Sequence, residues 1–75
     1  MVADFNIFPN PVYDWLNISR KDGVQIKDIE IISVIGEKVW TGKAHSKELR
    51  INIEYLPIGV YFLQIGNETR MFVKE

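Results

Sequence analysis

Short apolar stretches separated by turn-forming residues follow one another along the whole chain. In the clearest stretch, Leu49, Ile51 and Ile53 alternate with polar residues, and Leu16 and Ile18 do the same nearer the start. Alternation with a period of two is typical of a strand that buries one face. We therefore predict seven short strands, over residues 4–8, 15–19, 25–35, 38–44, 48–53, 59–65 and 69–74.

Turn-forming residues mark the ends of these predicted strands. The first strand ends at Pro9-Asn10-Pro11, and the second ends at Lys21-Asp22-Gly23. Gly36-Glu37 fits a two-residue hairpin with glycine at the first central position, and Gly66-Asn67 is expected to make the last hairpin turn. The third segment, residues 25–35, departs from simple alternation because its apolar residues change face midway. This change predicts a bulge, or a strand that is covered on both sides.

No helix is predicted, because no segment of ten or more residues keeps a 3.6-residue period. Seven short strands in 75 residues predict an all-β fold. The expected architecture is a compact immunoglobulin-like β-sandwich of about seven short antiparallel strands. Residues 1–75 are expected to form a single domain. A small barrel is the alternative architecture.

Composition and charge exclude several classes of function. Nine basic and ten acidic residues are interspersed and leave a net charge of −1, so no basic patch for nucleic acid or an acidic membrane is present. The absence of cysteine excludes disulfides, thiolate catalysis and zinc–thiolate sites. No apolar stretch is long enough to cross a bilayer. Residues 1–20 lack the basic and apolar regions of a secretory signal, so any export address is expected elsewhere.

No catalytic, cofactor-binding or metal-binding residue is predicted. His45 is the only histidine, and it lies in a polar stretch, residues 43–47, that is expected to be a solvated loop. Asp28 and Glu30 share one face of a predicted strand, and that face is expected to meet solvent because Ile29 takes the other. We therefore do not expect an enzyme.

Aromatic residues suggest two different roles. Tyr61 follows Leu-Pro-Ile-Gly-Val, and this segment looks like a tyrosine corner, in which the hydroxyl bonds to nearby upstream backbone. Four other aromatic residues would suit a platform for stacking sugars, or would cover sheet edges or fill the core. They are Tyr13, Trp15, Trp40 and Tyr55.

The Pro-Asn-Pro segment is the least common feature of the chain. Pro9 and Pro11 fix the backbone on either side of Asn10, and Asn10 is pushed toward extended geometry because it precedes a proline. Neither proline has an N–H donor, so the segment suits a sheet edge. Asp14, three residues later, is able to accept a hydrogen bond from a turn backbone. The segment is either a rigid crossover between strands or a surface element for recognition.

Four blocks of sequence occur in a characteristic order. The first joins an aliphatic–aromatic pair to Pro-Asn-Pro, Asp and alternating apolar residues, and the second is an apolar strand with a Gly hairpin. The third contains Leu-Pro-Ile-Gly-Val-Tyr, and the fourth is a short basic and apolar end. With these blocks, residues 7–18, 29–39, 53–65 and 70–75, the chain resembles the type A C-terminal sorting domain of the type IX (Por) secretion system of Bacteroidetes. Ile32 and Ser33 are small departures, because the family often has Tyr and Asp or Asn there.

The resemblance implies a secretion and sorting signal without catalysis of its own. It implies recognition by the type IX outer-membrane translocon and its shuttle proteins, and usual removal by a surface sortase. It implies an N-terminal cargo domain in a larger secreted protein, and no nucleic-acid partner or membrane insertion. The implied location is the periplasm in transit, followed by the outer-membrane surface or the medium.

Residues from all four blocks are candidates for recognition by the translocon. The Pro-Asn-Pro edge and the last two strands are the main ones, because an open sheet edge offers backbone groups for strand addition. Replacing both Arg70 and Lys74 by Glu in a folded domain should then abolish export. The full set of candidates is Pro9, Asn10, Pro11, Asp14, Gly36, Gly59, Tyr61, Arg70 and Lys74.

Two other functions stay open at this stage. A carbohydrate-binding or adhesion module of a secreted glycanase would need exposed, coplanar aromatic residues. A spacer sandwich would only hold neighbouring domains apart, so its deletion would leave export unaffected.

Overall fold

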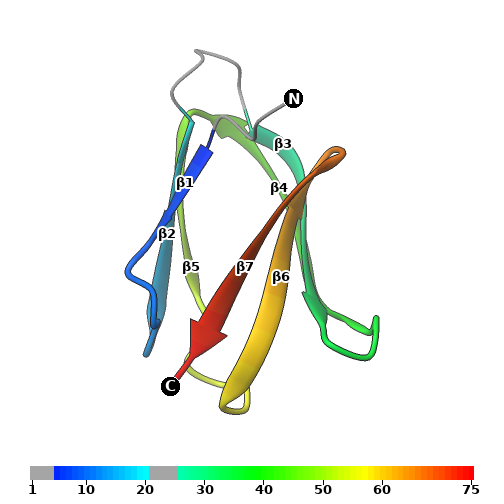
Figure 1. Cartoon of the computed structure of the whole chain (residues 1–75). Helices are drawn as coiled ribbons and strands as arrows, with labels where there is room; N and C mark the ends of the chain where they lie inside the picture. Colours follow the sequence, from blue (N-terminus) through cyan, green and yellow to red (C-terminus); the bar gives the residue numbers. More distant parts are fainter. Residues whose placement is uncertain (1–4, 21–25) are drawn as a thin grey trace.

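Seven strands and no helix make up the part of the chain that the structure, a computed structural model, describes, namely residues 5–20 and 26–75 (Figure 1). The predicted strand starts at residues 4 and 25, and the predicted turn at residues 21–23, lie outside the described residues. The strands are β1 (Phe5–Phe8), β2 (Trp15–Arg20), β3 (Ile26–Ser33), β4 (Lys38–Ser46), β5 (Glu48–Asn52), β6 (Gly59–Ile65) and β7 (Glu68–Lys74).

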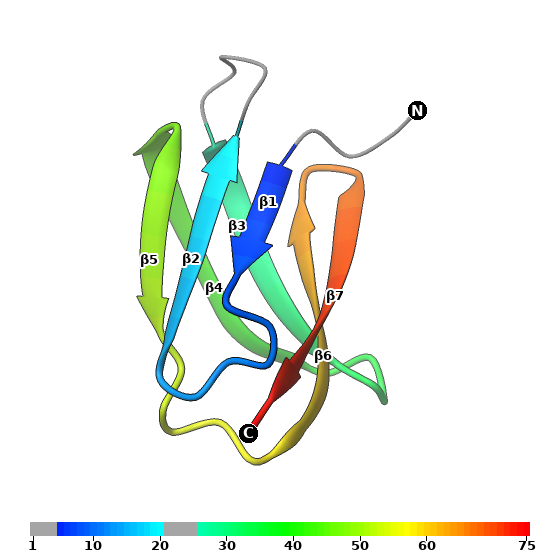
Figure 2. The same ribbon diagram turned by 60° about the vertical axis from the view of Figure 1, so that its left-hand side comes forward.

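The strands form two antiparallel sheets that face one another (Figures 1 and 2). One sheet has the order β1-β2-β5 and the other the order β4-β3-β6-β7. The predicted all-β sandwich is therefore confirmed. The chain crosses from one sheet to the other at Lys47, between β4 and β5, and the carbonyl of Lys47 accepts a hydrogen bond from the N–H of Arg20 at 2.9 Å.

Apolar side chains from both sheets fill the space between them. The faces predicted from alternation are the buried ones, because Leu16 and Ile18 of β2 and Ile51 of β5 are almost fully covered. In β3, Ile29 is buried while Asp28 is exposed, as expected. The core is Phe5, Val12, Leu16, Ile18, Ile26, Ile29, Ile31, Ala44, Ile51, Ile53, Leu56, Tyr61, Leu63, Ile65 and Phe72.

One hairpin differs from its prediction. The N–H of Gly36 bonds to the carbonyl of Ser33, and the N–H of Ser33 bonds to the carbonyl of Glu37, both at 2.9 Å. The loop therefore has three residues and ends in Gly36 at φ +84°, so the predicted two-residue Gly36-Glu37 loop is wrong. A left-handed residue after a tight turn is the usual form of a three-residue hairpin loop. The two-residue turn at Gly66-Asn67 is confirmed, because Ile65 pairs with Glu68.

The irregularity expected in the third strand is present in its pairing with β4. The register shifts once between Ile26 and Asp28 and again between Ile31 and Ile32. At both shifts the additional residue belongs to β4. β4 itself extends to Ser46, so the stretch at residues 43–47 is mostly strand and the prediction of a loop there is wrong. Its outward polar residues are those expected of a solvated edge strand.

Candidate functional site

The segment that leaves β1 crosses over to the last strand of the other sheet. The N–H of Val12 donates to the carbonyl of Val73, and the N–H of Glu75 donates to the carbonyl of Val12, both at 2.8 Å. Val12 and Lys74 thereby form a parallel bridge. Figure 2 shows this loop beside the end of β7. The first and fourth sequence blocks therefore meet in one place, which we call the terminal surface (residues 9–14 and 73–75).

The Pro-Asn-Pro segment adds a side-chain contact to this bridge. The Oδ1 atom of Asn10 accepts a hydrogen bond from the N–H of Val73 at 3.0 Å. Pro9 and Pro11 are exposed, and the peptide bond before each of them is cis. Because Asn10 and Val12 already bind the outward backbone groups of Val73, this part of β7 is not an open edge.

Tyr13 and Asp14 complete the terminal surface. Tyr13 is 62% exposed, and its hydroxyl donates to Oε2 of Glu75 at 3.2 Å. The Oδ1 atom of Asp14 accepts from the N–H of Trp15 at 2.7 Å, which agrees with the expected bond to a turn backbone. The carbonyl of Asp14 accepts from the N–H of Ile53, also at 2.7 Å. The segment is thus fixed both to the end of β7 and to the end of β5.

Lys74 is a buried member of the terminal surface. Only 5% of the residue is exposed, because it lies on the same inward face of β7 as Phe72. Its Nζ atom donates to the carbonyl oxygen of Glu75 at 2.8 Å, so the charged end reaches the last residue while the alkyl stem is covered. Gly59 is paired with Lys74 across the β6–β7 ladder.

The predicted tyrosine corner is confirmed. The hydroxyl of Tyr61 donates to the carbonyl of Pro57 at 2.7 Å, and its ring stacks on Phe72 with centroids 5.7 Å apart. Tyr61 is buried, so it supports the turn before β6 rather than offering a surface contact.

Two further candidates lie away from the terminal surface. Arg70 pairs with Leu63 farther up β7, and its guanidinium lies 5.6 Å from the ring centroid of Phe5 in the opposite sheet. Nearby, Arg20 and Glu68 form an ion pair at 3.2 Å between the sheets. Gly36 lies at the β3–β4 hairpin, at the other edge of the four-stranded sheet from β7.

The four aromatic residues considered for a sugar platform do not share one face. Trp40 packs against the core from β4, and its ring covers Gly42, where an added Cβ would lie 2.5 Å from Cη2 of the indole. Trp15 is on β2 of the other sheet and is partly exposed. Tyr13 and Tyr55 are exposed in loops.

A comparison with protein families decides what this chain is. Residues 6–75 match the family model of the secretion system C-terminal sorting domain. The chain belongs to this family. Such domains are sorting signals for the type IX secretion of Bacteroidetes, they are not a family of enzymes, and they imply export to the cell surface or the extracellular space. Comparisons with curated proteins and with solved structures give no match.

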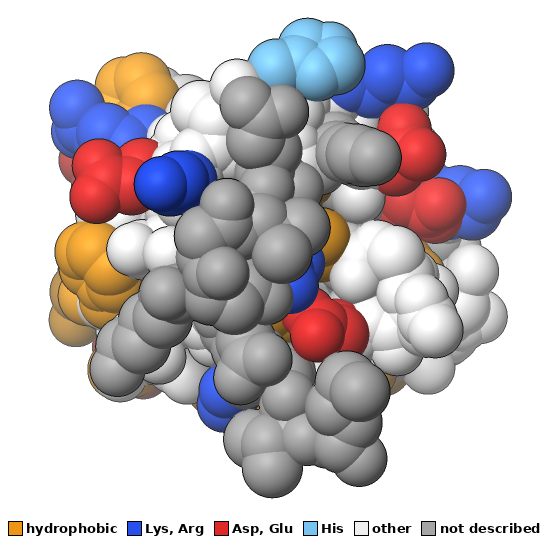
Figure 3. Space-filling view, turned by 90° about the horizontal axis from the view of Figure 1, so that it is seen from above, with side chains coloured by type: hydrophobic (Ala, Val, Ile, Leu, Met, Phe, Trp, Pro, Cys, Tyr) orange, Lys and Arg blue, Asp and Glu red, His pale blue; other side chains and the backbone are white. Residues whose placement is uncertain are grey.

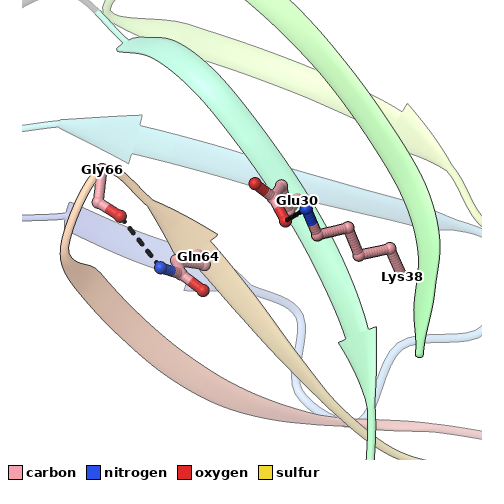
Figure 4. A network of polar contacts seen from close by, with 4 residues as sticks. All are labelled: Glu30, Lys38, Gln64 and Gly66. Atoms are coloured by element: carbon pink, nitrogen blue, oxygen red, sulfur yellow. Dashed lines mark hydrogen bonds and ion pairs between the residues drawn. The ribbon is translucent and has the colours of Figure 1, made fainter. Parts of the chain in front are cut away.

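In the sorting domain the two acidic residues of β3, Asp28 and Glu30, form ion pairs with lysines of β4. Glu30 lies 3.3 Å from Nζ of Lys38, and Asp28 lies 3.9 Å from Nζ of Lys43. Figure 4 shows the Glu30–Lys38 pair on the outer face of the sheet, where the side-chain amide of Gln64 donates to the carbonyl of Gly66. Basic and acidic side chains are also interspersed over the end of the sandwich seen in Figure 3.

The described part of the sorting domain contains neither a cluster of metal-binding side chains nor a membrane-spanning helix. Within residues 5–20 and 26–75, no three acidic, His or Cys side chains gather to hold a metal ion. Over the same described part of the chain, no helix has the length and hydrophobicity needed to span a membrane.

The contacts between the two ends of the sorting domain were not visible in its sequence. Val12 and Val73 meet through backbone atoms, and alternation carries no information about which loop lies beside which strand. The one local signal is Asn10, because it stands between two prolines and its side chain carries an oxygen that is able to accept a hydrogen bond.

Proposed function

We propose that the type IX outer-membrane translocon and its shuttle proteins recognise the terminal surface of the folded domain. The observation that carries this proposal is the set of hydrogen bonds joining residues 10–13 to residues 73–75. These bonds bring the first and fourth sequence blocks together in one surface. A partner that binds this surface recognises only the folded domain, because neither block forms the surface alone.

A stiff surface suits a signal that must serve many cargoes. Pro9 and Pro11 restrict the backbone, and Asn10 and Tyr13 are anchored to β7 and Glu75, so little conformational entropy is lost on binding. The exposed ring of Tyr13 offers an amphipathic contact of the kind enriched in protein interfaces.

Most of the other candidates hold the terminal surface in place without offering a contact of their own. Lys74 and Gly59 hold the end of β7 in place, and Tyr61 fixes the turn that leads into β6. Arg70 holds β7 against β1 through Phe5. Gly36 shapes a separate hairpin, and we assign it no contact with the translocon.

The domain is proposed to be the C-terminal part of a longer polypeptide whose N-terminal cargo it exports. The cargo passes through the periplasm, the translocon accepts it by way of the domain, and a surface sortase then removes the domain. Membership of the sorting-domain family supports this proposed order.

Export of a reporter tests the proposal. Residues 1–75 are fused to the C-terminus of a periplasmic fluorescent protein in a Bacteroidetes host, with and without the type IX translocon. We expect surface or medium fluorescence only in the host with the translocon, and a loss of mass where the sortase removes the domain. Retention in both hosts would contradict the proposal, and unchanged export after deletion of the domain would favour a spacer.

A pair of variants locates the recognition surface. Tyr13→Ala removes the exposed ring of the terminal surface and should reduce export while the domain stays folded. Ile35→Ala removes an exposed apolar side chain from the distant β3–β4 hairpin and should leave export unchanged. Circular dichroism and thermal unfolding confirm that both variants fold. Equal export of the two variants would overturn the assignment of the terminal surface.

A further inference from the structure

A groove of about 470 Å³ lies on the three-stranded sheet. Its side chains come from all three strands, with Phe8 on β1, Asn17 and Ser19 on β2, and Glu48 and Arg50 on β5. None of these residues belongs to the terminal surface. The volume is in the range of sites for small ligands.

The ladder register places the five side chains in two rows on the outer face. Phe8 is opposite Asn17, which is opposite Arg50, and Ser19 is opposite Glu48. Directly opposed residues of an antiparallel pair have Cβ atoms about 4.5–5.5 Å apart. Three strands therefore present a polar strip about 10 Å wide with an aromatic ring at one side.

Several of these groups are held in position before any ligand arrives. The side-chain amide of Asn17 donates to the carbonyl of Phe8 at 3.1 Å, which leaves its oxygen as an acceptor. The guanidinium of Arg50 lies 4.5 Å from the ring centroid of Trp15, a cation–π contact that restrains its long side chain. Half of the surface of Phe8 is exposed. Restrained side chains lose less entropy on binding.

The chemistry of the groove selects the class of ligand. Arg50 and Glu48 are two residues apart on one strand face, so their charges offset and an ionic ligand gains little. The hydroxyl of Ser19, the amide oxygen of Asn17 and the two charged groups supply donors and acceptors that match sugar hydroxyls. The exposed ring of Phe8 matches the apolar C–H face of a pyranose.

A peptide lying along the floor of this groove would gain no backbone hydrogen bonds. Strand addition needs unpaired backbone groups, but β2, which forms the floor, is paired with β1 and β5 on its two sides. We propose that the groove binds a neutral oligosaccharide, with Phe8 stacking on one ring and Asn17, Ser19, Glu48 and Arg50 binding its hydroxyls. This site is independent of the export surface.

Nuclear magnetic resonance titration tests the proposal with four probes: cellohexaose, laminarihexaose, mannohexaose and xylohexaose. At least one of them should shift the amide signals of residues 17–19 and 48–50 and the side-chain amide of Asn17, with Kd of about 1 mM or below. Phe8→Ala should weaken that binding about tenfold. Met71→Ala, which removes an exposed apolar side chain from β7, should leave the affinity unchanged.

Three results would overturn the proposal: no shift with any probe, shifts confined to residues outside the groove, or equal affinity of the Phe8→Ala variant. A neutral extended dodecapeptide that shifts the groove signals when the sugars do not would assign the face to a protein partner instead. Reporter export of Phe8→Ala separates the two functions, because it should match the parent domain whether or not sugar binding is lost.

Discussion

The side-chain oxygen of Asn10 accepts a hydrogen bond from the backbone N–H of Val73, which lies 63 residues farther along the chain. No other side chain of the Pro-Asn-Pro segment is able to make this contact, because prolines have neither donors nor acceptors in their side chains. The bond therefore explains why a residue with a short side chain that ends in a hydrogen-bond acceptor stands between the two prolines.

Replacing Asn10 by Ala should weaken both stability and export. The lost bond is exposed to water, so we expect the free energy of unfolding to fall by about 0.5 kcal/mol. For a domain of this size, the midpoint of thermal unfolding should fall by roughly 2–4 °C. Export of the reporter should fall more than this small loss of stability explains, because the terminal surface loses an anchor.

Asn10→Asp is the matched control for this change. Its carboxylate keeps an oxygen that is able to accept the Val73 N–H, so stability and export should stay close to those of the parent domain. If Asn10→Asp lost export as fully as Asn10→Ala, the hydrogen bond would not be the reason for the residue.

The tyrosine corner should contribute to stability alone. Tyr61→Phe removes the bond to the carbonyl of Pro57 and keeps the stacking on Phe72. We expect the free energy of unfolding, measured in urea, to fall by about 1–1.5 kcal/mol. Tyr55→Phe, at an exposed loop residue, should change it by less than about 0.5 kcal/mol. A Tyr61→Phe domain that folds but is not exported would contradict a purely supporting role.

The Arg20–Glu68 ion pair between the sheets should contribute more to the free energy of unfolding than the ion pairs on the outer face. The side chain of Arg20 is 10% exposed and that of Glu68 is 23% exposed, whereas Lys43 and Asp28 are 79% and 73% exposed. Glu68→Gln removes the negative charge that lies 3.2 Å from the mostly covered Arg20 guanidinium, so we expect a loss of about 1–3 kcal/mol. Asp28→Asn should change the free energy of unfolding by less than about 0.5 kcal/mol.

Salt distinguishes the two pairs further. The loss caused by Glu68→Gln should persist in about 1 M NaCl, because covered pairs are screened less than exposed ones. Urea unfolding with and without salt measures both effects. Equal losses for the two substitutions would mean that the Arg20–Glu68 pair behaves as a surface pair.

Strand faces were predictable from the sequence because burial imposes a period of two, as at Leu16 and Ile18. The position of the β3–β4 loop was not predictable. Val34 and Ile35 are apolar, so the apolar pattern extends the predicted strand through them, yet they are 66% and 81% exposed. Only the bonds between Ser33 and Gly36 and between Ser33 and Glu37 define where the loop begins and ends.

The terminal surface was predictable only as separate pieces. Alternation puts Lys74 on the same face of β7 as Phe72, whereas the charge of Lys74 favours solvent. The structure reconciles the two, because the stem is buried while Nζ reaches the carbonyl of Glu75. Contacts such as the one between Tyr13 and Glu75 depend on how the two sheets close around the core, and no local pattern encodes them.

The burial of Lys74 changes how its role should be tested. With 5% of the residue exposed, a change to Glu would place a carboxylate where the domain holds a covered stem, and loss of export would then follow from unfolding. Lys74→Met keeps the length and apolar character of the stem and removes only the charge. We expect it to fold with a free energy of unfolding within about 1 kcal/mol of the parent domain.

Export of the folded Lys74→Met domain decides between support and direct recognition. If Lys74 only holds the end of β7, the reporter should reach the surface as it does with the parent domain. Lys74→Ala, which also removes the buried stem, should lose about 2 kcal/mol of stability and some export with it. Loss of export by a Lys74→Met domain that is folded by circular dichroism would instead mean that the translocon reads the ammonium group, and that the end of β7 opens to present it.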